Sequence, residues 1–120
     1  MLYLAPTDLD VALEALAGES LTVLAGGTDF YPARVGKPLI EPVLDISHLS
    51  SLRGIEISAG SYRIGALTHW SDIREATLPA GFDGLRLAAR EVGAAQVQNA
   101  GTIGGNLCNA SPAADGIPPL

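Results

Sequence analysis

Two short glycine-rich segments hold the residues best suited to bind a ligand. The first glycine segment is Ala25-Gly26-Gly27-Thr28-Asp29, and the second glycine segment is Gly101-Thr102-Ile103-Gly104-Gly105-Asn106. Glycine permits positive φ angles and close approach of a ligand to the backbone, and successive N–H groups in a turn form a concave anion site. Thr28, Thr102 and Asn106 add short side-chain donors. Together the two segments could clamp one diphosphate from two sides.

Each segment alone is also compatible with an ordinary tight turn, and only the pair favours a functional interpretation. The sequence contains no G-x-G-x-x-G pattern, so a Rossmann dinucleotide site is not supported. It contains no G-x-x-x-x-G-K-[ST] pattern either, which argues against a P-loop nucleotide triphosphatase. No pair of acidic and basic side chains indicates substrate chemistry, so no catalytic residue is assigned.

The composition limits the remaining classes of function. The chain has 120 residues, 48% of them apolar and 17% charged, which is enough for a core in one domain or part of one. Its net charge of −6 makes nucleic acid a poor partner, so a bound phosphate would depend on backbone N–H groups. The start of the chain lacks the features of a signal peptide, and no apolar run reaches the length of a membrane span, so a cytoplasmic location is expected.

Cysteine and histidine are too few for a metal or disulfide framework. Cys108 is the one cysteine, which excludes a disulfide within the chain and a self-contained iron–sulfur cluster. His48 and His69 are isolated from any zinc-type spacing, and each is expected to be a surface or capping residue.

Local patterns predict helices and strands in mixed order, and therefore an α/β or α+β fold. Asp8 or Thr7 is expected to cap a helix that carries Leu9, Ala12, Leu13 and Leu16 on one face and ends at Gly18. From residue 94 onward small polar residues dominate, and no helix or strand is predicted. The other expected elements are strands at 21–25 and 43–46, a short helix at 30–35, a turn at 49–52, a hairpin at 55–58 and 62–65 with its turn at 59–61, and helices from 68 and from 85 to 93.

The residues 24–29, together with 98–107 running on to 110–115, resemble the FAD-binding domain of molybdenum hydroxylases. This family includes the flavin subunits of xanthine dehydrogenase, aldehyde oxidase and carbon monoxide dehydrogenase. The resemblance extends over essentially all 120 residues, since the opening helix after Pro6 and the residues 65–68 also fit. Many relatives have basic residues near the positions of Gln98 and Ala100, which are neutral here.

The resemblance implies the bipartite FAD-binding fold of the vanillyl-alcohol oxidase (PCMH) type. Residues 1–65 would form the first subdomain and residues 66–120 the start of the second. The family's flavin domain continues past the position of Leu120 and ends in a cap domain, so this chain is expected to be its N-terminal portion and to bind FAD weakly or not at all by itself. The residues implied at the diphosphate are Ala25, Gly26, Gly27, Thr28, Asp29, Thr102, Ile103, Gly104, Gly105 and Asn106, and those implied near the flavin and ribityl chain are Asn109 and Asp115.

The resemblance also implies a role in electron transfer. The family's FAD takes electrons from two iron–sulfur clusters supplied by a molybdenum cofactor, and passes them to NAD or another acceptor. Since this chain cannot hold the clusters, an iron–sulfur subunit and a molybdenum-cofactor subunit are the expected partners. The alternative is a flavin-free remnant or binding module of the same fold. An FAD oxidase with its own substrate site is less well supported.

Overall fold

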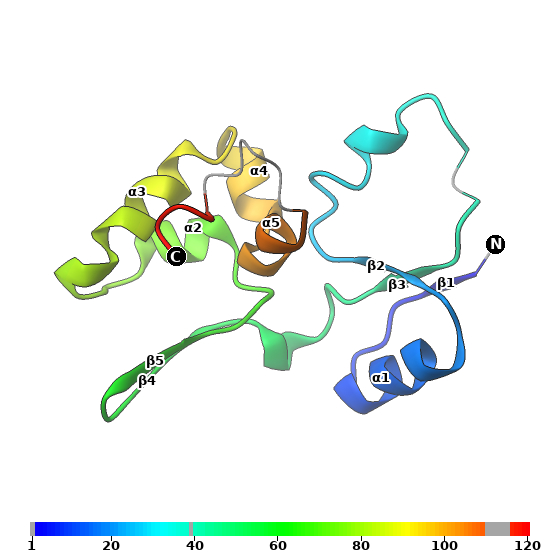
Figure 1. Cartoon of the computed structure of the whole chain (residues 1–120), viewed down its shortest axis with the longest axis horizontal. Coiled ribbons are helices and arrows are strands. Elements are labelled where there is room, and N and C mark those ends of the chain that lie inside the picture. The colour runs from blue at the N-terminus through cyan, green and yellow to red at the C-terminus, as the bar shows by residue number, and fades with distance from the viewer. Residues whose placement is uncertain (1, 39, 110–115) are drawn as a thin grey trace.

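The computed structural model describes residues 2–38, 40–109 and 116–120, which fold into two groups of elements (Figure 1). The N-terminal group contains β1 (Tyr3–Leu4), α1 (Leu9–Gly18), β2 (Thr22–Leu24), η1 (Pro32–Arg34), β3 (Val43–Asp45) and η2 (Ser50–Leu52). The C-terminal group contains β4 (Ile55–Ser58), β5 (Ser61–Ile64), α2 (Trp70–Glu75), η3 (Ala80–Phe82), α3 (Asp83–Glu91), α4 (Ala95–Ala100) and α5 (Ile103–Asn109). The predicted α/β class is confirmed.

A three-stranded parallel sheet organises the N-terminal group. The strand order is β1-β3-β2, and Leu44 at the centre pairs with Leu4 on one side and Val23 on the other. All three residues of β3 are buried, as expected for the middle strand of a parallel sheet. The carboxyl ends of β2 and β3 lie at the same edge, and β2 leads directly into the first glycine segment.

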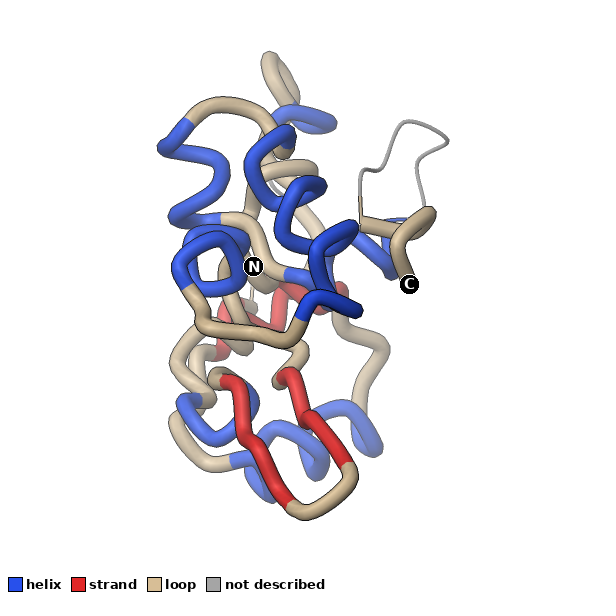
Figure 2. Tube along the Cα trace, turned by 90° about the vertical axis from the view of Figure 1, so that its left-hand side faces the viewer, coloured by secondary structure: helices blue, strands red, loops and turns tan. Residues whose placement is uncertain are grey.

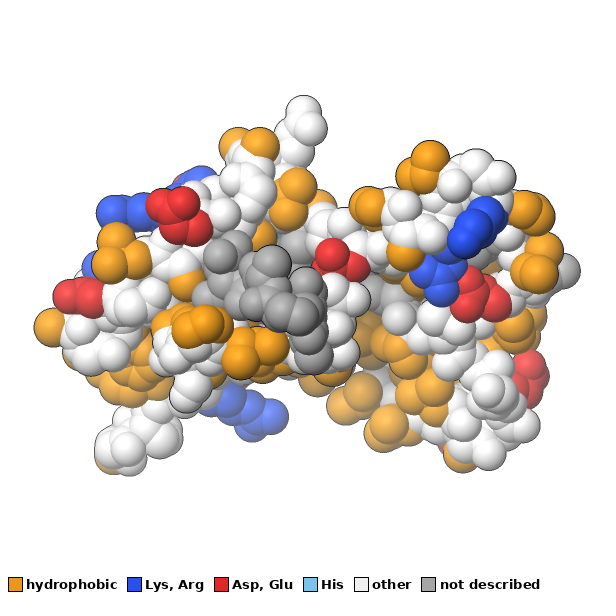
Figure 3. Space-filling model, turned by 45° about the horizontal axis from the view of Figure 1, so that its top comes forward, with side chains coloured by type: hydrophobic (Ala, Val, Ile, Leu, Met, Phe, Trp, Pro, Cys, Tyr) orange, Lys and Arg blue, Asp and Glu red, His pale blue; other side chains and the backbone are white. Residues whose placement is uncertain are grey.

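Helix α1 begins where the sequence predicts, but most of its leucines do not enter the core. Asp8 is the N-cap residue, and its carboxylate accepts a hydrogen bond from the Asp10 N–H at 2.8 Å. Only Ala12 is buried, in a cluster with residues of β3 and η2. Leu9, Leu13 and Leu16 are 38%, 54% and 39% exposed. Hydrophobic side chains lie at the surface of both parts of the molecule (Figure 3).

The C-terminal group packs its helices around one apolar cluster beside an exposed hairpin. The antiparallel pairing of β4 with β5 confirms the predicted hairpin, which Gly60 closes at a φ of 78° (Figure 2). Leu87 of α3 is 58% exposed, so this helix also presents apolar surface to solvent. The buried cluster consists of Trp70, Ile73, Leu85, Ala89, Val92 and Ile103.

Two predicted elements differ from the structure. The helix expected at residues 30–35 is a single 3-10 turn at Pro32–Arg34, closed by a hydrogen bond from the Val35 N–H to the Pro32 carbonyl at 3.4 Å. The segment after residue 94, for which no element was expected, forms α4 and α5. Gly104 and Gly105 therefore lie in a helix and not in a turn. None of the helices in the described ranges has the length and apolar character needed to cross a membrane.

Candidate functional site

The two glycine segments meet at the centre of the molecule, where the loop after β2 faces α5 (Figure 1). Gly26 lies against the end of α4. A Cβ placed on Gly26 would be 2.1 Å from the carbonyl oxygen of Ala100 and 2.8 Å from its carbonyl carbon. A Cβ on Gly101 would be 3.4 Å from Thr28 Oγ1. The structure thus brings together two segments that are far apart in sequence, as their joint role requires.

A cavity of about 510 Å³ opens at this contact, within the size range of small-molecule and cofactor sites. Its apolar wall, which was not evident from the sequence, includes Leu24, Trp70, Val92 and Val97. Of the residues proposed from the sequence, the cavity is lined by Ala25, Gly26, Gly27, Thr28, Asp29, Thr102, Gly104, Gly105, Asn106 and Asn109.

One of the proposed residues that the structure describes, Ile103, is not part of this lining. Ile103 is 6% exposed, and its side chain belongs to the core cluster around Trp70. It can therefore reach a ligand only through its backbone. Asp115 lies outside the described residues.

The first glycine segment offers unused backbone donors. Gly27 has a φ of 76°, and its carbonyl accepts a hydrogen bond from the Tyr31 N–H at 3.2 Å. Among the described residues, no hydrogen bond takes up the N–H groups of residues 26–29, which lie outside any helix or strand. Successive free N–H groups in a loop are the donor set that an anion requires.

The second glycine segment offers fewer such donors, because most of its N–H groups are already bonded within the protein. The bonds are Ile103 N–H to the Thr68 carbonyl (3.0 Å), Gly104 N–H to the Ala66 carbonyl (2.9 Å), Gly105 N–H to Thr102 Oγ1 (3.0 Å) and Asn106 N–H to the Thr102 carbonyl (3.0 Å). A Cβ on Gly104 would lie 2.7 Å from the Ala66 carbonyl oxygen. Glycine is therefore required here by the close packing of α5 against residues 66–68.

The hydrogen-bond donors that the second segment presents to the cavity are mainly side chains. Thr102 Oγ1 accepts from the Gly105 N–H, which leaves the hydroxyl proton free to be donated. Asn106 Oδ1 accepts from the Gly116 N–H at 3.3 Å, and its amide NH₂ is a further donor group. The arrangement can bind an anion between backbone donors on one side and neutral side-chain donors on the other.

Positive charge contributes little to this cavity. Arg34 is the one basic residue among the described lining residues, and it is ion-paired with Glu41 and stacked 3.8 Å from the Phe30 ring centroid. The hydrogen bond from Arg34 lowers the pKa of Glu41. Gln98 is 5% exposed and donates to the Arg90 carbonyl at 2.9 Å. It lies in the helix packing and is not among the residues that line the cavity.

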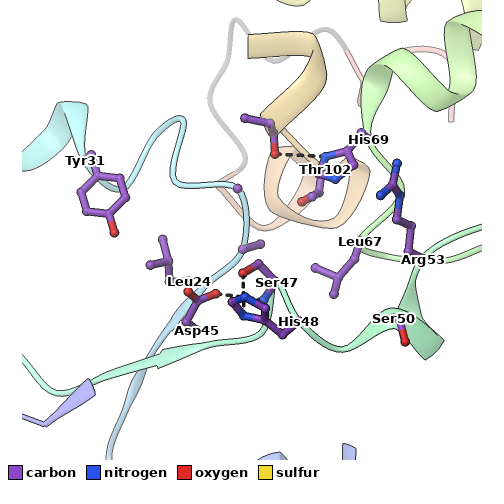
Figure 4. A pocket seen from close by; sticks show the side chains of 13 residues that line it. Leu24, Tyr31, Asp45, Ser47, His48, Ser50, Arg53, Leu67, His69 and Thr102 are labelled. Carbon is purple, nitrogen blue, oxygen red and sulfur yellow. Dashed lines mark hydrogen bonds between the residues drawn. The ribbon is translucent and has the colours of Figure 1, made fainter. Parts of the chain in front are cut away.

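A second cavity, of about 450 Å³, shares Gly26 and Thr102 with the first and has a more polar lining (Figure 4). Asp45, 7% exposed, accepts hydrogen bonds from the Tyr3 hydroxyl and from the Ser47 N–H at 2.9 Å. Burial raises the pKa of Asp45, but the hydrogen bonds from Ser47 and Tyr3 outweigh it and hold this pKa below its usual value. The bond to Asp45 raises the pKa of Tyr3 to about 12.

The two histidines also line this second cavity, and both fit their predicted roles. His48 is exposed, and its Nδ1 lies 3.4 Å from Ser47 Oγ. His69 is the N-cap residue of α2. Within the described ranges, no three His, Cys, Asp or Glu side chains are grouped so that they could hold a metal ion.

Comparison with known proteins places the chain beside flavin-binding subunits. Residues 1–120 match the family model described as the FAD binding domain in molybdopterin dehydrogenase. The chain is 37% identical to the glyceraldehyde dehydrogenase medium chain of Sulfolobus acidocaldarius, over 94% of this chain and 41% of that protein. It is 36% identical to the xanthine dehydrogenase FAD-binding subunit of Escherichia coli O157:H7, over 81% of this chain and 34% of that protein.

A solved structure supports the same relationship. The structure of carbon monoxide dehydrogenase from Hydrogenophaga pseudoflava that lacks the Mo-pyranopterin moiety of the molybdenum cofactor superposes with a TM-score of 0.78 at 30% identity. The match covers 93% of this chain and 40% of that one. The chain thus spans about two fifths of the length of the relatives it matches.

Proposed function

Because the chain belongs to the family of FAD-binding domains of molybdopterin dehydrogenases, we propose that it holds FAD by the diphosphate at the junction of its two glycine segments. The observation that carries this proposal is the run of N–H groups at residues 26–29, which have no hydrogen-bond partner among the described residues and line one cavity with Thr102 and Asn106. A diphosphate needs several donors at short range, and here they are mostly neutral. The residues present therefore fit the group.

We propose that the two segments bind the diphosphate through different groups. The backbone of residues 26–29 and the Thr28 hydroxyl would bind phosphate oxygens, whereas Thr102 and Asn106 would donate from their side chains. The apolar wall around Trp70 and Val92 would cover a ring system and exclude water from it. Asn109 and Asp115 remain proposed contacts to the flavin and ribityl chain, and the division of the chain near residue 65 remains a proposed subdomain boundary.

The parent protein is proposed to be the flavin subunit of a molybdenum-containing dehydrogenase. FAD, when bound, supplies the capacity to accept electrons and pass them on. The partners would be an iron–sulfur subunit and a molybdenum-cofactor subunit, since Cys108 alone cannot hold a cluster. Relatives named as medium chains of larger dehydrogenases support this assignment. NAD is one candidate acceptor beside oxygen or a quinone, and electron transfer and a cytoplasmic location stay predictions.

The proposal is tested by titrating the purified protein that carries this chain with FAD and following the quenching of flavin fluorescence. ADP and AMP serve as competing probes. If the diphosphate is the main point of attachment, ADP displaces FAD at clearly lower concentration than AMP does. Absence of FAD binding in the folded protein would refute the proposal and favour the flavin-free module. Equal competition by ADP and AMP would show that the glycine junction does not bind the diphosphate.

A further inference from the structure

The carbonyl group of Ala100 is where the second glycine segment touches the first, and a histidine side chain holds it there. His69 Nδ1 lies 3.2 Å from the Ala100 carbonyl oxygen and 3.2 Å from that of Gly101 (Figure 4). Carbonyl oxygens only accept, so Nδ1 must carry the proton and donate to this pair. The same Ala100 oxygen is the atom that a Cβ on Gly26 would meet at 2.1 Å.

The main chain of His69 is itself fixed by hydrogen bonds to neighbouring residues. The backbone N–H of His69 donates to Asp72 Oδ2 at 3.0 Å. Arg53 donates two hydrogen bonds to the same carboxylate, from Nε at 3.0 Å and from Nη2 at 2.9 Å. The main chain of His69 also forms an antiparallel bridge with Thr102, flanked by the bond from the Trp70 N–H to the Gly101 carbonyl at 3.3 Å. The ring is therefore anchored on α2 and reaches out to residues 100–101.

The two carbonyls depend on the ring to different degrees. Gly101 retains the Trp70 N–H as a donor if the ring is removed. For the Ala100 oxygen, no donor other than His69 is found among the described residues. Without the ring, this peptide group would lose the bond that keeps it against Gly26, and a partly buried acceptor would be left unpaired.

We propose that His69 is a positioning residue of the FAD site. By holding the 100–101 peptide against Gly26, it sets the distance between the N–H groups of residues 26–29 and the donors of Thr102 and Asn106. It does this from outside the FAD cavity, since His69 lines the second cavity and not the first. This inference rests on the proposed function, because the distance matters only if one ligand spans both segments.

The test compares three variants of the protein that carries this chain. His69→Leu removes the donor, whereas His69→Asn places an amide nitrogen close to the position of Nδ1 and keeps it. His48→Leu removes the other histidine of the same cavity and is the matched control, because in the described part of the chain the His48 ring bonds only to Ser47. Loss of one hydrogen bond at a partly buried acceptor predicts about a tenfold rise in Kd for His69→Leu. His69→Asn and His48→Leu should stay within about threefold of the wild type.

Both FAD and ADP are titrated, and thermal unfolding of the ligand-free protein is recorded for each variant. Equal fold-losses for FAD and ADP in His69→Leu would support positioning at the diphosphate. Wild-type affinity in a folded His69→Leu variant would overturn the inference. So would equal losses in the Leu and Asn variants, since the ring volume and not the hydrogen bond would then matter.

A purely structural role would lower the unfolding temperature without changing the affinity of the folded protein. If His69→Leu does not fold, His69→Gln replaces it, because its amide nitrogen lies one bond further out. Gln is then expected to lose affinity and Asn to keep it, and equal affinities would overturn the inference. A wild-type protein that binds neither FAD nor ADP would instead refute the proposed function, so the two failures are distinguishable.

Discussion

Replacing Gly26 with alanine tests whether protein packing or ligand approach demands glycine at the first segment. The added Cβ would lie 2.1 Å from the Ala100 carbonyl oxygen, 2.8 Å from its carbonyl carbon and 3.1 Å from the Gly101 Cα. All three are backbone atoms, so no side chain can rotate away. Gly26 is not among the glycines with positive φ, so alanine adds no conformational strain and the whole effect is steric.

The magnitude follows from the required displacement. One backbone must move by roughly 1 Å or more before the contact becomes tolerable, and overpacking of this kind costs about 1–3 kcal/mol of folding free energy. The shift also separates the N–H groups of residues 26–29 from Thr102. We therefore expect Gly26→Ala to lower both the free energy of unfolding without ligand and the affinity for FAD, the latter by about tenfold or more.

Urea unfolding of the FAD-free protein and a fluorescence titration with FAD measure the two effects separately. Gly18→Ala is the matched control, since Gly18 ends α1 and a Cβ there would meet nothing within 4 Å. The control should leave FAD affinity unchanged and alter stability by no more than about 1 kcal/mol, in the stabilising direction. If Gly26→Ala weakens FAD binding but leaves ligand-free stability unchanged, the ligand and not Ala100 requires the glycine, and the reasoning above is wrong.

Three further predictions address the elements around the site. Thr102→Val removes the acceptor of the Gly105 N–H and should cost about 1 kcal/mol in urea unfolding and weaken ADP binding, whereas Thr102→Ser should restore both. Asp8→Ala removes the N-cap of α1 and should cost about 1 kcal/mol of stability without changing FAD affinity in the folded protein; a changed affinity would contradict the separation of α1 from the site. The hydrogen bonds from Arg53 hold the pKa of Asp72 below its usual value. The stabilisation from this ion pair is therefore present above about pH 3.9, and it is lost as the pH falls through the lower pKa that Asp72 has in the folded protein. Arg53→Met should therefore be less stable than the wild type at pH 7, with the difference shrinking toward pH 2, and a difference that does not depend on pH would argue against this ion pair.

Local signals in the sequence were sufficient for the elements that local interactions determine. The Asp8 cap, the Gly18 end of α1 and a tight turn around Gly60 could be predicted, because capping and turn chemistry involve neighbouring residues, although Ser61, expected in the turn, belongs to β5. The inward face of α1 was not readable beyond Ala12. An apolar stripe shows which residues share a face, but not how much of that face another element covers.

The helix α5 shows why the second glycine segment was misinterpreted as a turn. Its two glycines disfavour a helix by propensity. Tertiary contacts overcome this, since the Ile103 and Gly104 N–H groups bond to carbonyls of residues 66–68. The same long-range contacts could not be inferred from one sequence, and neither could the approach of His69 to the 100–101 peptide.

The two glycine segments require glycine for different physical reasons. In the first segment, Gly27 supplies a positive φ, and the N–H groups of residues 26–29 have no partner in the described part of the chain, which leaves them available for the proposed diphosphate. In the second segment, Gly104 lets α5 approach Ala66, and the Gly104 N–H donates a hydrogen bond to the Ala66 carbonyl. A bulky residue at 104 would thus reach the ligand only indirectly, by moving Thr102 and Asn106. Loss of FAD binding in Gly104→Val would therefore not by itself place the ligand against Gly104. Only retained ligand-free stability together with lost ADP affinity would do so, whereas the packing seen here predicts that stability falls first.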